Sequence, residues 1–169
     1  MAKNKFDKNM GVIHMCDVER MLFEGRVIFP VVDHNGLIVG AVGRSLKLQP
    51  KYKVVGNGFV GNVLTEASVI ILTEGIVDVL LAQLQGADNV LGVVGAEVTE
   101  DAIRAFAARK KKIALFFDQD KYGKASAAKL AKRMELAGLA VDVFETDTAI
   151  DMQQYLLQGN AVASIVNCV

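Results

Sequence analysis

Acidic side chains directly follow two apolar runs in this sequence of 169 residues. Glu74 comes after VIILT at 69–73, and Asp118 and Asp120 come after IALFF at 113–117. Carboxylates that gather within about 4–6 Å repel one another, and one of them is driven to take up a proton. A divalent cation removes that repulsion, and acidic ligands with room for water and phosphate oxygens suit Mg²⁺ or Mn²⁺. The pattern therefore predicts a metal site for phosphoryl chemistry.

A further acid and a glycine strengthen this prediction. Asp78 lies four residues beyond Glu74, so in the first turn of a helix it faces the same way. Asp118 and Asp120 point to opposite sides of a continuing strand, and a turn between them, which Gly123 permits, brings them together. The alternative is that these acids cap helices or lie solvated in loops. An isolated DxD after a strand favours that alternative, whereas a second acidic motif at another strand end favours the metal site.

The elements that position these acids are expected to alternate between strands and helices. Short apolar runs without alternation are typical of strands buried on both faces, and we expect four, at 69–73, 90–94, 113–117 and 140–144. Helical spacing and capping residues predict four helices, at 76–85, 100–109, 124–137 and 150–158. Such repeats predict an α/β fold with a parallel sheet and helices on both faces. Ligands of these sheets bind beyond the carboxyl ends of the strands, where the acids lie.

The first third of the chain has a different pattern. Two β-rich runs, at 26–33 and 37–43, flank a His-Asn-Gly sequence that is typical of a hairpin turn. Pro30 in the first run predicts an edge strand or a bulge. The stretch 12–23 before the hairpin predicts a short amphipathic helical turn, and the basic, glycine-containing stretch 44–62 after it predicts a loop.

Length and composition limit the class of protein. The length fits one domain with an arm, which we expect to divide at residue 62 into an arm over 1–62 and an α/β domain over 63–169. The chain is 52% hydrophobic and 22% charged, which excludes a disordered protein. Its zero net charge argues against a bulk polyanion binder, but the charge is uneven: +4 over 1–60, −6 over 61–108 and +2 over 109–169.

The two cysteines have no zinc-ligand or disulfide-framework spacing, and the N-terminus has no signal-peptide pattern. The longest apolar stretches have about five residues, far fewer than a membrane span needs. We therefore expect a soluble, cytoplasmic protein with free thiols.

The acidic motifs TEGIVD at 73–78 and FFDQD at 116–120 resemble the Toprim domain, which bacterial-type primases, topoisomerases, small nucleases and recombination proteins share. The spacing of 44 residues between their leading acids suits that domain. The preceding segments, GRVIFPVVDHNGLIVGAVGR at 25–44 and PKY at 50–52, resemble the hairpin and basic loop before the Toprim domain of bacterial replicative primases. The resemblance runs over about 11–159. It implies a Toprim-like parallel sheet flanked by helices and preceded by a β-hairpin and a basic loop.

The resemblance also implies roles for individual residues. The implied catalytic and metal-binding acids are Glu74, Asp118 and Asp120. Asp78 and Asp151 match further acids of the motifs, although Met152 replaces the proline that usually follows the latter. The implied contacts to nucleotide phosphates and template are Arg26, Arg44, Lys51 and Tyr52. Lys124 opens a predicted helix beside the acids and is a candidate phosphate contact, with a plain surface role as the alternative.

The implied activity is DNA primase-like: nucleotidyl transfer that makes RNA primers on a single-stranded DNA template from nucleoside triphosphates, with two Mg²⁺ or Mn²⁺ ions. The zinc-binding module and most of the first half of the polymerase region of primases are absent from the sequence. We therefore expect a need for missing domains or for a partner, such as a helicase or another replication protein. The alternatives are a small Toprim nuclease and a non-catalytic module that binds nucleic acid or a replication protein.

Other chemistries fit the sequence less well. Strand passage requires a nucleophilic tyrosine in an added domain. A phosphatase of the DxD type requires Thr or Val where Tyr122 stands and needs its motif on the first strand. A phosphoacceptor receiver domain requires its acidic pair near the start of the chain.

Overall fold

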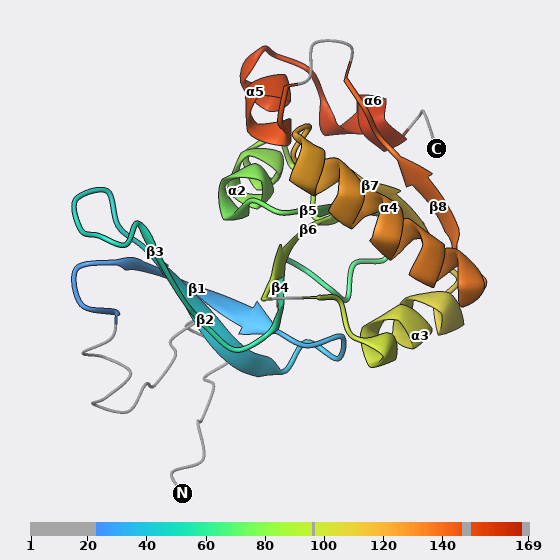
Figure 1. Cartoon of the computed structure of the whole chain (residues 1–169), viewed down its shortest axis with the longest axis horizontal. Coiled ribbons are helices and arrows are strands. Elements are labelled where there is room, and N and C mark those ends of the chain that lie inside the picture. Colours follow the sequence, from blue (N-terminus) through green and yellow to red (C-terminus); the bar gives the residue numbers. More distant parts are fainter. Residues whose placement is uncertain (1–22, 96, 147–149, 167–169) are drawn as a thin grey trace, which may run out of the picture.

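One mixed sheet of eight strands organises the computed structural model, which describes residues 23–95, 97–146 and 150–166 (Figure 1). The strand order is β3-β2-β1-β4-β6-β5-β7-β8. The strands are β1 (Val27–Val32), β2 (Ile38–Arg44), β3 (Tyr52–Val55), β4 (Gly58–Val60), β5 (Val69–Thr73), β6 (Val90–Val94), β7 (Lys112–Leu115) and β8 (Ala140–Val143). The helices are α2 (Ile76–Leu84), α3 (Glu100–Ala108), α4 (Lys121–Leu136), α5 (Met152–Leu157) and α6 (Val162–Val166).

The sheet has an antiparallel half and a parallel half. Strands β6, β5, β7 and β8 are parallel, as predicted for the α/β part. Strands β1, β2 and β3 pair antiparallel, and β4 joins the halves because it pairs antiparallel with both β1 and β6. The predicted fold class is therefore confirmed, with the addition that the hairpin extends the same sheet.

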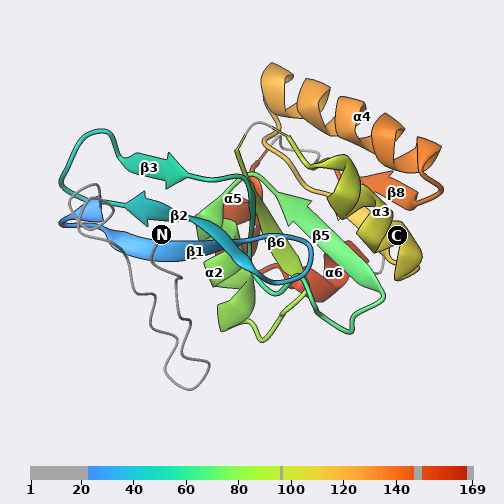
Figure 2. The ribbon, with the colours of Figure 1, turned by 90° about the horizontal axis from the view of Figure 1, so that it is seen from below.

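Side chains of β5 show why the predicted strands lack alternation. All five residues of β5 are buried. Ile70 and Leu72 pack in a core with α3 and α4, whereas Val69 and Ile71 pack in a second core with α2, α5 and α6. Figure 2 shows the two groups of helices on opposite sides of the parallel strands. Burying each such side chain stabilises the fold by about 1.5–3 kcal/mol, so both faces of this strand must be apolar.

The predicted hairpin is present. The Asp33 carboxylate accepts hydrogen bonds from the backbone N–H groups of Asn35 and Leu37, at 2.8 and 3.0 Å, and Gly36 has a φ of 78°. Glycine adopts this left-handed conformation without strain, which is why it closes the turn. The ladder between β1 and β2 has an irregularity between Val31 and Val32, directly after Pro30, as a proline inside a strand predicts.

The prediction of a loop over 44–62 is wrong, because this stretch contains β3 and β4. The neighbouring β2 approaches β3 closely because Gly40 has no side chain: a Cβ atom there would lie 2.0 Å from the Val55 carbonyl oxygen. Gly56, with a φ of 87°, makes the turn between β3 and β4. The β-branched and aromatic residues of the stretch outweigh its glycines and lysines.

Two basic residues after α3 hold the β1–β2 turn and the segment between β4 and β5. The Arg109 guanidinium, after α3, donates hydrogen bonds to the carbonyl oxygens of Val63 and His34, at 3.0 and 2.7 Å. The Lys111 ammonium donates to the carbonyl oxygens of Thr65 and Ala67, at 2.8 and 2.7 Å. Arg109 therefore has a structural role, because it helps to hold the β1–β2 turn in position.

Most predicted helices are present within one or two residues of their expected bounds. Helix α4 begins at Lys121, three residues before the predicted start, and α6 was not predicted. The predicted helical turn over 12–23 lies outside the described residues except for Phe23, which is buried. None of the described helices is long and apolar enough to cross a membrane.

Candidate functional site

The candidate site lies where β5 and β7 end side by side. These strands are parallel neighbours, with Leu72 opposite Leu115. The chain leaves β5 toward α2 on one face and leaves β7 toward α4 on the other, which opens a crevice at the carboxyl edge of the sheet. Glu74 and Asp118 lie in this crevice, and the Asp118 backbone N–H donates a hydrogen bond to Glu74 Oε2 at 3.3 Å.

The turn between β5 and α2 brings the Asp78 carboxylate close to the backbone at Gly75. Asp78 is only 5% exposed and accepts a hydrogen bond from the Thr73 hydroxyl at 2.6 Å. A Cβ atom on Gly75 would lie 2.4 Å from Asp78 Oδ2, so only glycine fits between Glu74 and this carboxylate. Burial, helped by the negative charges of Asp151 and Asp118 and opposed by the Thr73 hydroxyl, raises the pKa of Asp78 to about 6.

The predicted turn between Asp118 and Asp120 is present and has a capping role. Asp120 Oδ1 accepts hydrogen bonds from the backbone N–H groups of Tyr122 and Gly123, both at 2.8 Å, and so forms the N-cap of α4. A Cβ atom on Gly123 would lie 2.1 Å from the Asp118 carbonyl oxygen, so this glycine is needed for the turn to close.

Asp151 is also an N-cap and reaches the same region. Its Oδ1 accepts a hydrogen bond from the Gln154 backbone N–H at 2.7 Å at the start of α5. Proline is common at the first position of a helix, and Met152, which replaces the family's proline, occupies that position here with a buried side chain. The substitution therefore leaves the cap intact. The Asp151 charge raises the pKa of both Asp78 and Asp118.

The five acids interact electrostatically. Burial raises the pKa of Glu74, and the charges of Asp118, Asp120 and Asp78 raise it further, while the Asp118 N–H opposes the shift. Burial is also the main cause of the raised pKa of Asp118, followed by the charges of Asp151 and Asp120. Within the described ranges, no three His, Cys, Asp or Glu side chains are close enough to hold one ion. The donor set still suits a hard divalent cation, because all donors are carboxylate oxygens whose mutual repulsion a cation would relieve.

The predicted basic and aromatic residues gather on the antiparallel half. Arg44 and Tyr52 are opposite each other in the β2–β3 ladder, and the Arg44 guanidinium lies 5.6 Å from the centre of the Tyr52 ring. The Lys51 ammonium lies 5.9 Å from the same ring. Arg44 Nε is buried and has no hydrogen-bond partner in the part of the chain that the structure describes. A buried donor without a partner lowers the stability of the fold, so Arg44 is a candidate to bind an anionic ligand.

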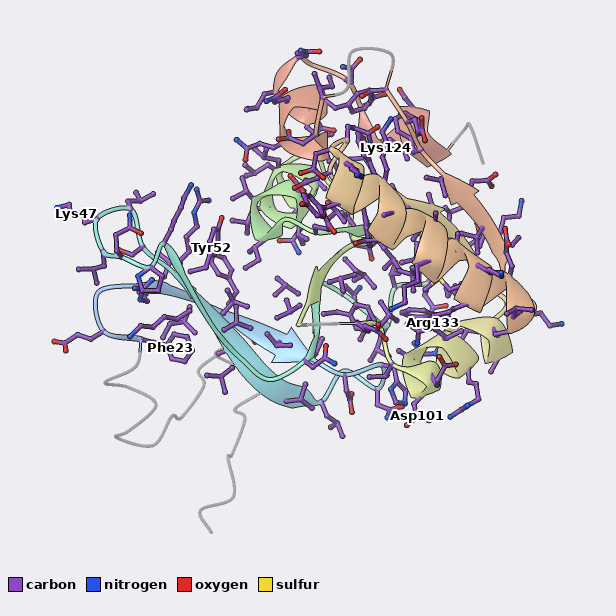
Figure 3. The ribbon with its side chains drawn as sticks, in the orientation of Figure 1. Phe23, Lys47, Tyr52, Asp101, Lys124 and Arg133 are labelled. Atoms are coloured by element: carbon purple, nitrogen blue, oxygen red, sulfur yellow. The ribbon has the colours of Figure 1, made fainter. Side chains whose placement is uncertain are left out.

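Arg26 does not join this group on the Tyr52 face. A Cβ atom on Gly43 would contact the Phe23 ring and the Arg26 stem, which places both on the opposite face of β2. Figure 3 shows Tyr52 and Phe23 on opposite sides of these strands. The Arg26 guanidinium instead donates a hydrogen bond to the Lys51 carbonyl oxygen at 3.1 Å, so it supports the position of Lys51.

A cavity of about 260 Å³ connects the aromatic group to the acids. Its walls include Val42, Tyr52 and Val54 of the antiparallel half and Glu74 and Gly75 of the β5–α2 turn. Sequence reasoning missed Val54 because it treated 44–62 as a loop, and without that strand it could not group Val42, in the predicted return strand, with this face. The alternation of strand residues is the signal that would have found them, since Val42 with Arg44 and Tyr52 with Val54 share one face.

Helix α4 contributes both expected and unexpected side chains. Lys124 forms an exposed ion pair with Glu145, at 3.4 Å, near the start of the helix. Sequence reasoning missed Lys129 and Arg133, which line a second cavity of about 310 Å³ beside Glu74. Their spacing of four residues places both on one face of the helix, which is the signal that would have grouped them. Figure 3 shows Lys124 and Arg133 near opposite ends of α4.

Known proteins share this sequence pattern and fold. The DNA primase of Staphylococcus aureus (strain COL) is 27% identical over 148 residues, which cover 79% of this chain and 25% of the primase. The chain thus spans about a quarter of the length of the curated primases that it matches.

Solved primases have the same fold. The Aquifex aeolicus primase structure, with zinc-binding and RNA polymerase domains, has a TM-score of 0.74 and 21% identity, and covers 96% of this chain and 43% of its own. A DnaG primase catalytic domain bound to ssDNA has a TM-score of 0.70 and 20% identity, and covers 85% of this chain and 51% of its own. The sequence model described as Toprim-like matches residues 71–156, which contain both acidic motifs and Asp151. Because this match covers slightly more than half of the chain, the protein belongs to the Toprim-like family.

Proposed function

We propose that this chain is the Toprim catalytic core of a DNA primase-like nucleotidyltransferase, which extends RNA primers on single-stranded DNA. The observation that carries the proposal is the cavity between Tyr52 and Glu74, because it joins a cationic, aromatic strand face to a set of repelling carboxylates. A nucleic acid strand that lies on the cationic, aromatic face therefore places its end at the carboxylates. The similarity to curated primases supports this assignment. The full reaction requires further primase domains or a partner protein, such as a helicase or another replication protein.

Glu74, Asp118 and Asp120 are the proposed ligands of two divalent cations, Mg²⁺ or Mn²⁺, and Asp78 and Asp151 support them. When bound, such cations neutralise the phosphate charge and the negative charge that develops during transfer. One oxygen each of Asp120 and Asp151 caps a helix, so the helix backbones fix the direction of these carboxylates.

In the proposed reaction, the 3′-oxygen of the primer attacks the α-phosphorus of a nucleoside triphosphate. The new O–P bond forms as the bond to the β-phosphate oxygen breaks, and pyrophosphate leaves. The proton of the 3′-hydroxyl passes to a base, for which Glu74 is the candidate. Its raised pKa makes it a better proton acceptor than an ordinary surface glutamate.

The antiparallel half is proposed to hold the strand. Arg44 and Lys51 supply positive charge for backbone phosphates, which bind without reading sequence. The Tyr52 ring, 38% exposed, supplies a surface for base stacking. Lys124 is proposed as an additional phosphate contact near the acids once it leaves Glu145. We also propose that residues 1–62 serve as the strand-binding part and 63–169 as the metal-binding part.

Primer synthesis by the full chain tests the proposal. The reaction contains a single-stranded template, ribonucleotides and Mg²⁺ or Mn²⁺, with Asp118→Asn and Asp120→Asn run alongside. Templated products that disappear in both variants are the expected result. Cleavage of the template instead would assign the site to a nuclease, and strand binding without either reaction would assign it to a binding module.

A further inference from the structure

The sheet ends in two strands that lack a second neighbour. Strand β3 is the first of the strand order and β8 is the last, so each pairs on one side only within the described residues. Figure 1 shows these strands at opposite ends of the molecule. Tyr52, Val54 and Val55 of β3 are 38%, 51% and 41% exposed, and Val143 of β8 is 43% exposed. An exposed apolar edge of this kind is a template for pairing with another chain.

The free backbone groups of β3 belong to Tyr52 and Val54. The Ser45 N–H donates a hydrogen bond to the Lys51 carbonyl oxygen at 3.0 Å, in the register of the β2–β3 ladder. Hydrogen-bonded and non-hydrogen-bonded pairs alternate along an antiparallel ladder, so Lys53 is the next residue that bonds to β2. The N–H and C=O groups of Tyr52 and Val54 therefore point outward.

The free backbone groups of β8 belong to Val141 and Val143. The Phe144 N–H donates a hydrogen bond to the Leu115 carbonyl oxygen of β7 at 2.8 Å. Because the backbone groups of successive strand residues point to alternate sides, Asp142 also faces β7, whereas Val141 and Val143 face outward. Each edge thus offers two residues with free groups, and one charged residue lies between them.

The charged residues oppose pairing of like edges. A second copy that joined its β3 to β3 through the free groups would place Lys53 opposite Lys53. The same contact between two β8 strands would place Asp142 opposite Asp142. Like charges directly opposite each other in a ladder are destabilising, and a charge on an edge strand is a common means of preventing such contacts. A symmetric dimer through either edge is therefore disfavoured.

The two different edges complement each other. A single antiparallel register joins all four residues that have free groups. Its opposed residues are Tyr52 and Val143, Lys53 and Asp142, and Val54 and Val141. Aromatic with β-branched, opposite-charge and β-branched pairs are all favourable across a ladder. The two outer pairs exchange backbone hydrogen bonds, and the charged pair lies between them.

The faces of the two strands fit this register. Val54 is opposite Val42, which packs in the core with α2, so Tyr52 and Val54 are on that side of the sheet. Val141 packs against the core with α3 and α4, on the other side. Strands β3 and β8 run in the same direction. Antiparallel contact therefore needs a half-turn of the second copy about an axis across the strands, which brings its α4 side level with Tyr52.

We propose that copies of this chain associate head to tail, with β3 of one copy added to β8 of the next, so that the sheet continues from copy to copy. The contact joins two different surfaces, so it leaves a free edge at each end and does not close at a dimer. The strands are short and bury little surface, so the association is reversible and depends on concentration. This inference does not depend on the proposed nucleotidyl transfer.

Sedimentation equilibrium of the full chain over a concentration series, at low ionic strength, tests the proposal. The average mass should rise with concentration beyond that of a dimer. Lys53→Glu and Asp142→Lys should each abolish this rise, because like charges then lie opposite each other, and the double variant should restore it. A mixture of the two single variants should also associate, since each offers the edge that the other needs.

Two further variants separate the edge contact from other causes. Each single variant exchanges one charge for its opposite, so their net charges are −2 and +2, whereas the wild type and the double variant have none. Glu66→Lys also carries +2 but should associate like the wild type, because this exposed residue lies between β4 and β5, at neither edge. Val54→Pro removes an outward N–H, which an edge strand tolerates, and should abolish association without lowering the melting temperature greatly.

Several results would overturn the head-to-tail contact. A wild type that stays monomeric throughout the series, or that stops at a dimer, would do so. Loss of association in Glu66→Lys would assign the effect to net charge, and undiminished association in Val54→Pro would exclude the β3 backbone. A mixture of the single variants that stays monomeric would exclude pairing of unlike edges. The melting temperature of each variant shows whether it is folded, so that a lost association is a local effect.

Discussion

The backbone N–H of Asp118 donates a hydrogen bond to the carboxylate of Glu74, 44 residues earlier in the chain. This bond joins the ends of β5 and β7 at the point where the five acids gather. It also holds a glutamate in place while other acids repel it, so the position of Glu74 does not depend on a bound ion.

Glu74→Gln should separate the charge of this residue from its structural contact. The amide oxygen can still accept the Asp118 N–H, so the fold should be kept, whereas the carboxylate charge is lost. We expect the melting temperature of the wild type to rise with added Mn²⁺, because a ligand of the folded state stabilises it. The variant should show a much smaller rise. An equal Mn²⁺-dependent rise in both proteins would exclude Glu74 as a metal ligand.

Two substitutions of Asp120 should distinguish its cap from its charge. Asparagine is as good an N-cap as aspartate, so Asp120→Asn should change the free energy of unfolding little, whereas Asp120→Ala should lower it by about 1 kcal/mol. Both should abolish primer synthesis. Urea denaturation and the primer assay measure the two effects. Primer synthesis that survives in Asp120→Asn would show that only the cap matters.

Asp78 should make the protein less stable as the pH rises. The pKa of Asp78 is raised from 3.8 to about 6 in the folded state, so the folded protein binds more protons than the unfolded chain between these values. The stabilising contribution is therefore complete below about pH 4 and is lost as the pH passes 6, a change of about 2–3 kcal/mol. Asp78→Asn should be more stable than the wild type at pH 7 and should show a shallower slope, because only the raised pKa values of Glu74 and Asp118 remain. Urea denaturation from pH 4 to 7 without divalent cations measures it, and parallel profiles for the two proteins would contradict the prediction.

Tyr52 and Lys51 should contribute to strand binding in different ways. Tyr52→Ala should weaken binding of single-stranded DNA by about 1–3 kcal/mol, and Tyr52→Phe should keep most of it, because stacking needs only the ring. Lys51→Ala should reduce the salt dependence of binding by about one unit of log–log slope. Lys53→Ala is the control, because Lys53 directly follows Tyr52 in β3 and so points to the opposite face, whereas the Lys51 ammonium, before the strand, lies beside the Tyr52 ring. Equal losses for Lys51→Ala and Lys53→Ala would mean that the strand does not lie on the Tyr52 face.

Arg109→Ala should destabilise the protein by about 1–3 kcal/mol, because two carbonyl groups lose a charged donor. Lys110→Ala, in the adjacent exposed residue, should change stability much less. Chemical denaturation of both variants measures the difference. Similar stabilities would show that the contacts of Arg109 with Val63 and His34 do not hold the β1–β2 turn.

The sequence contained enough information for the parallel half and for its acids. The runs at 69–73 and 113–117 are apolar on both faces, and the first polar residues after them mark the strand ends, so local pattern and tertiary position agree. The hairpin followed from its Asn-Gly turn. These features depend on residues close together in the chain, for which periodicity and turn chemistry are reliable signals.

Features that depend on distant residues were not predictable in the same way. Strands β3 and β4 are short, and their partners lie 8 or more residues away, so local composition favoured a loop. The early start of α4 depends on Asp120 acting as a cap, which its proposed metal role had obscured. The cavity along α4 arises only when β6 and α4 are brought together. Side chains that meet through tertiary packing leave no periodic signal.

Strand β4 gives the molecule a fixed internal dimension. It hydrogen-bonds to β1 through Phe59 and to β6 through Gly58, Phe59 and Val60. The Tyr52 face of the antiparallel half and the carboxylates at the ends of β5 and β7 are therefore linked through the backbone ladder of one continuous sheet. Lengthening a surface turn would leave this spacing unchanged, but deleting a single residue from β4 would shift its register and turn Phe59 away from its core. The three residues of β4 thus set the spacing between the antiparallel half of the sheet and the carboxylates.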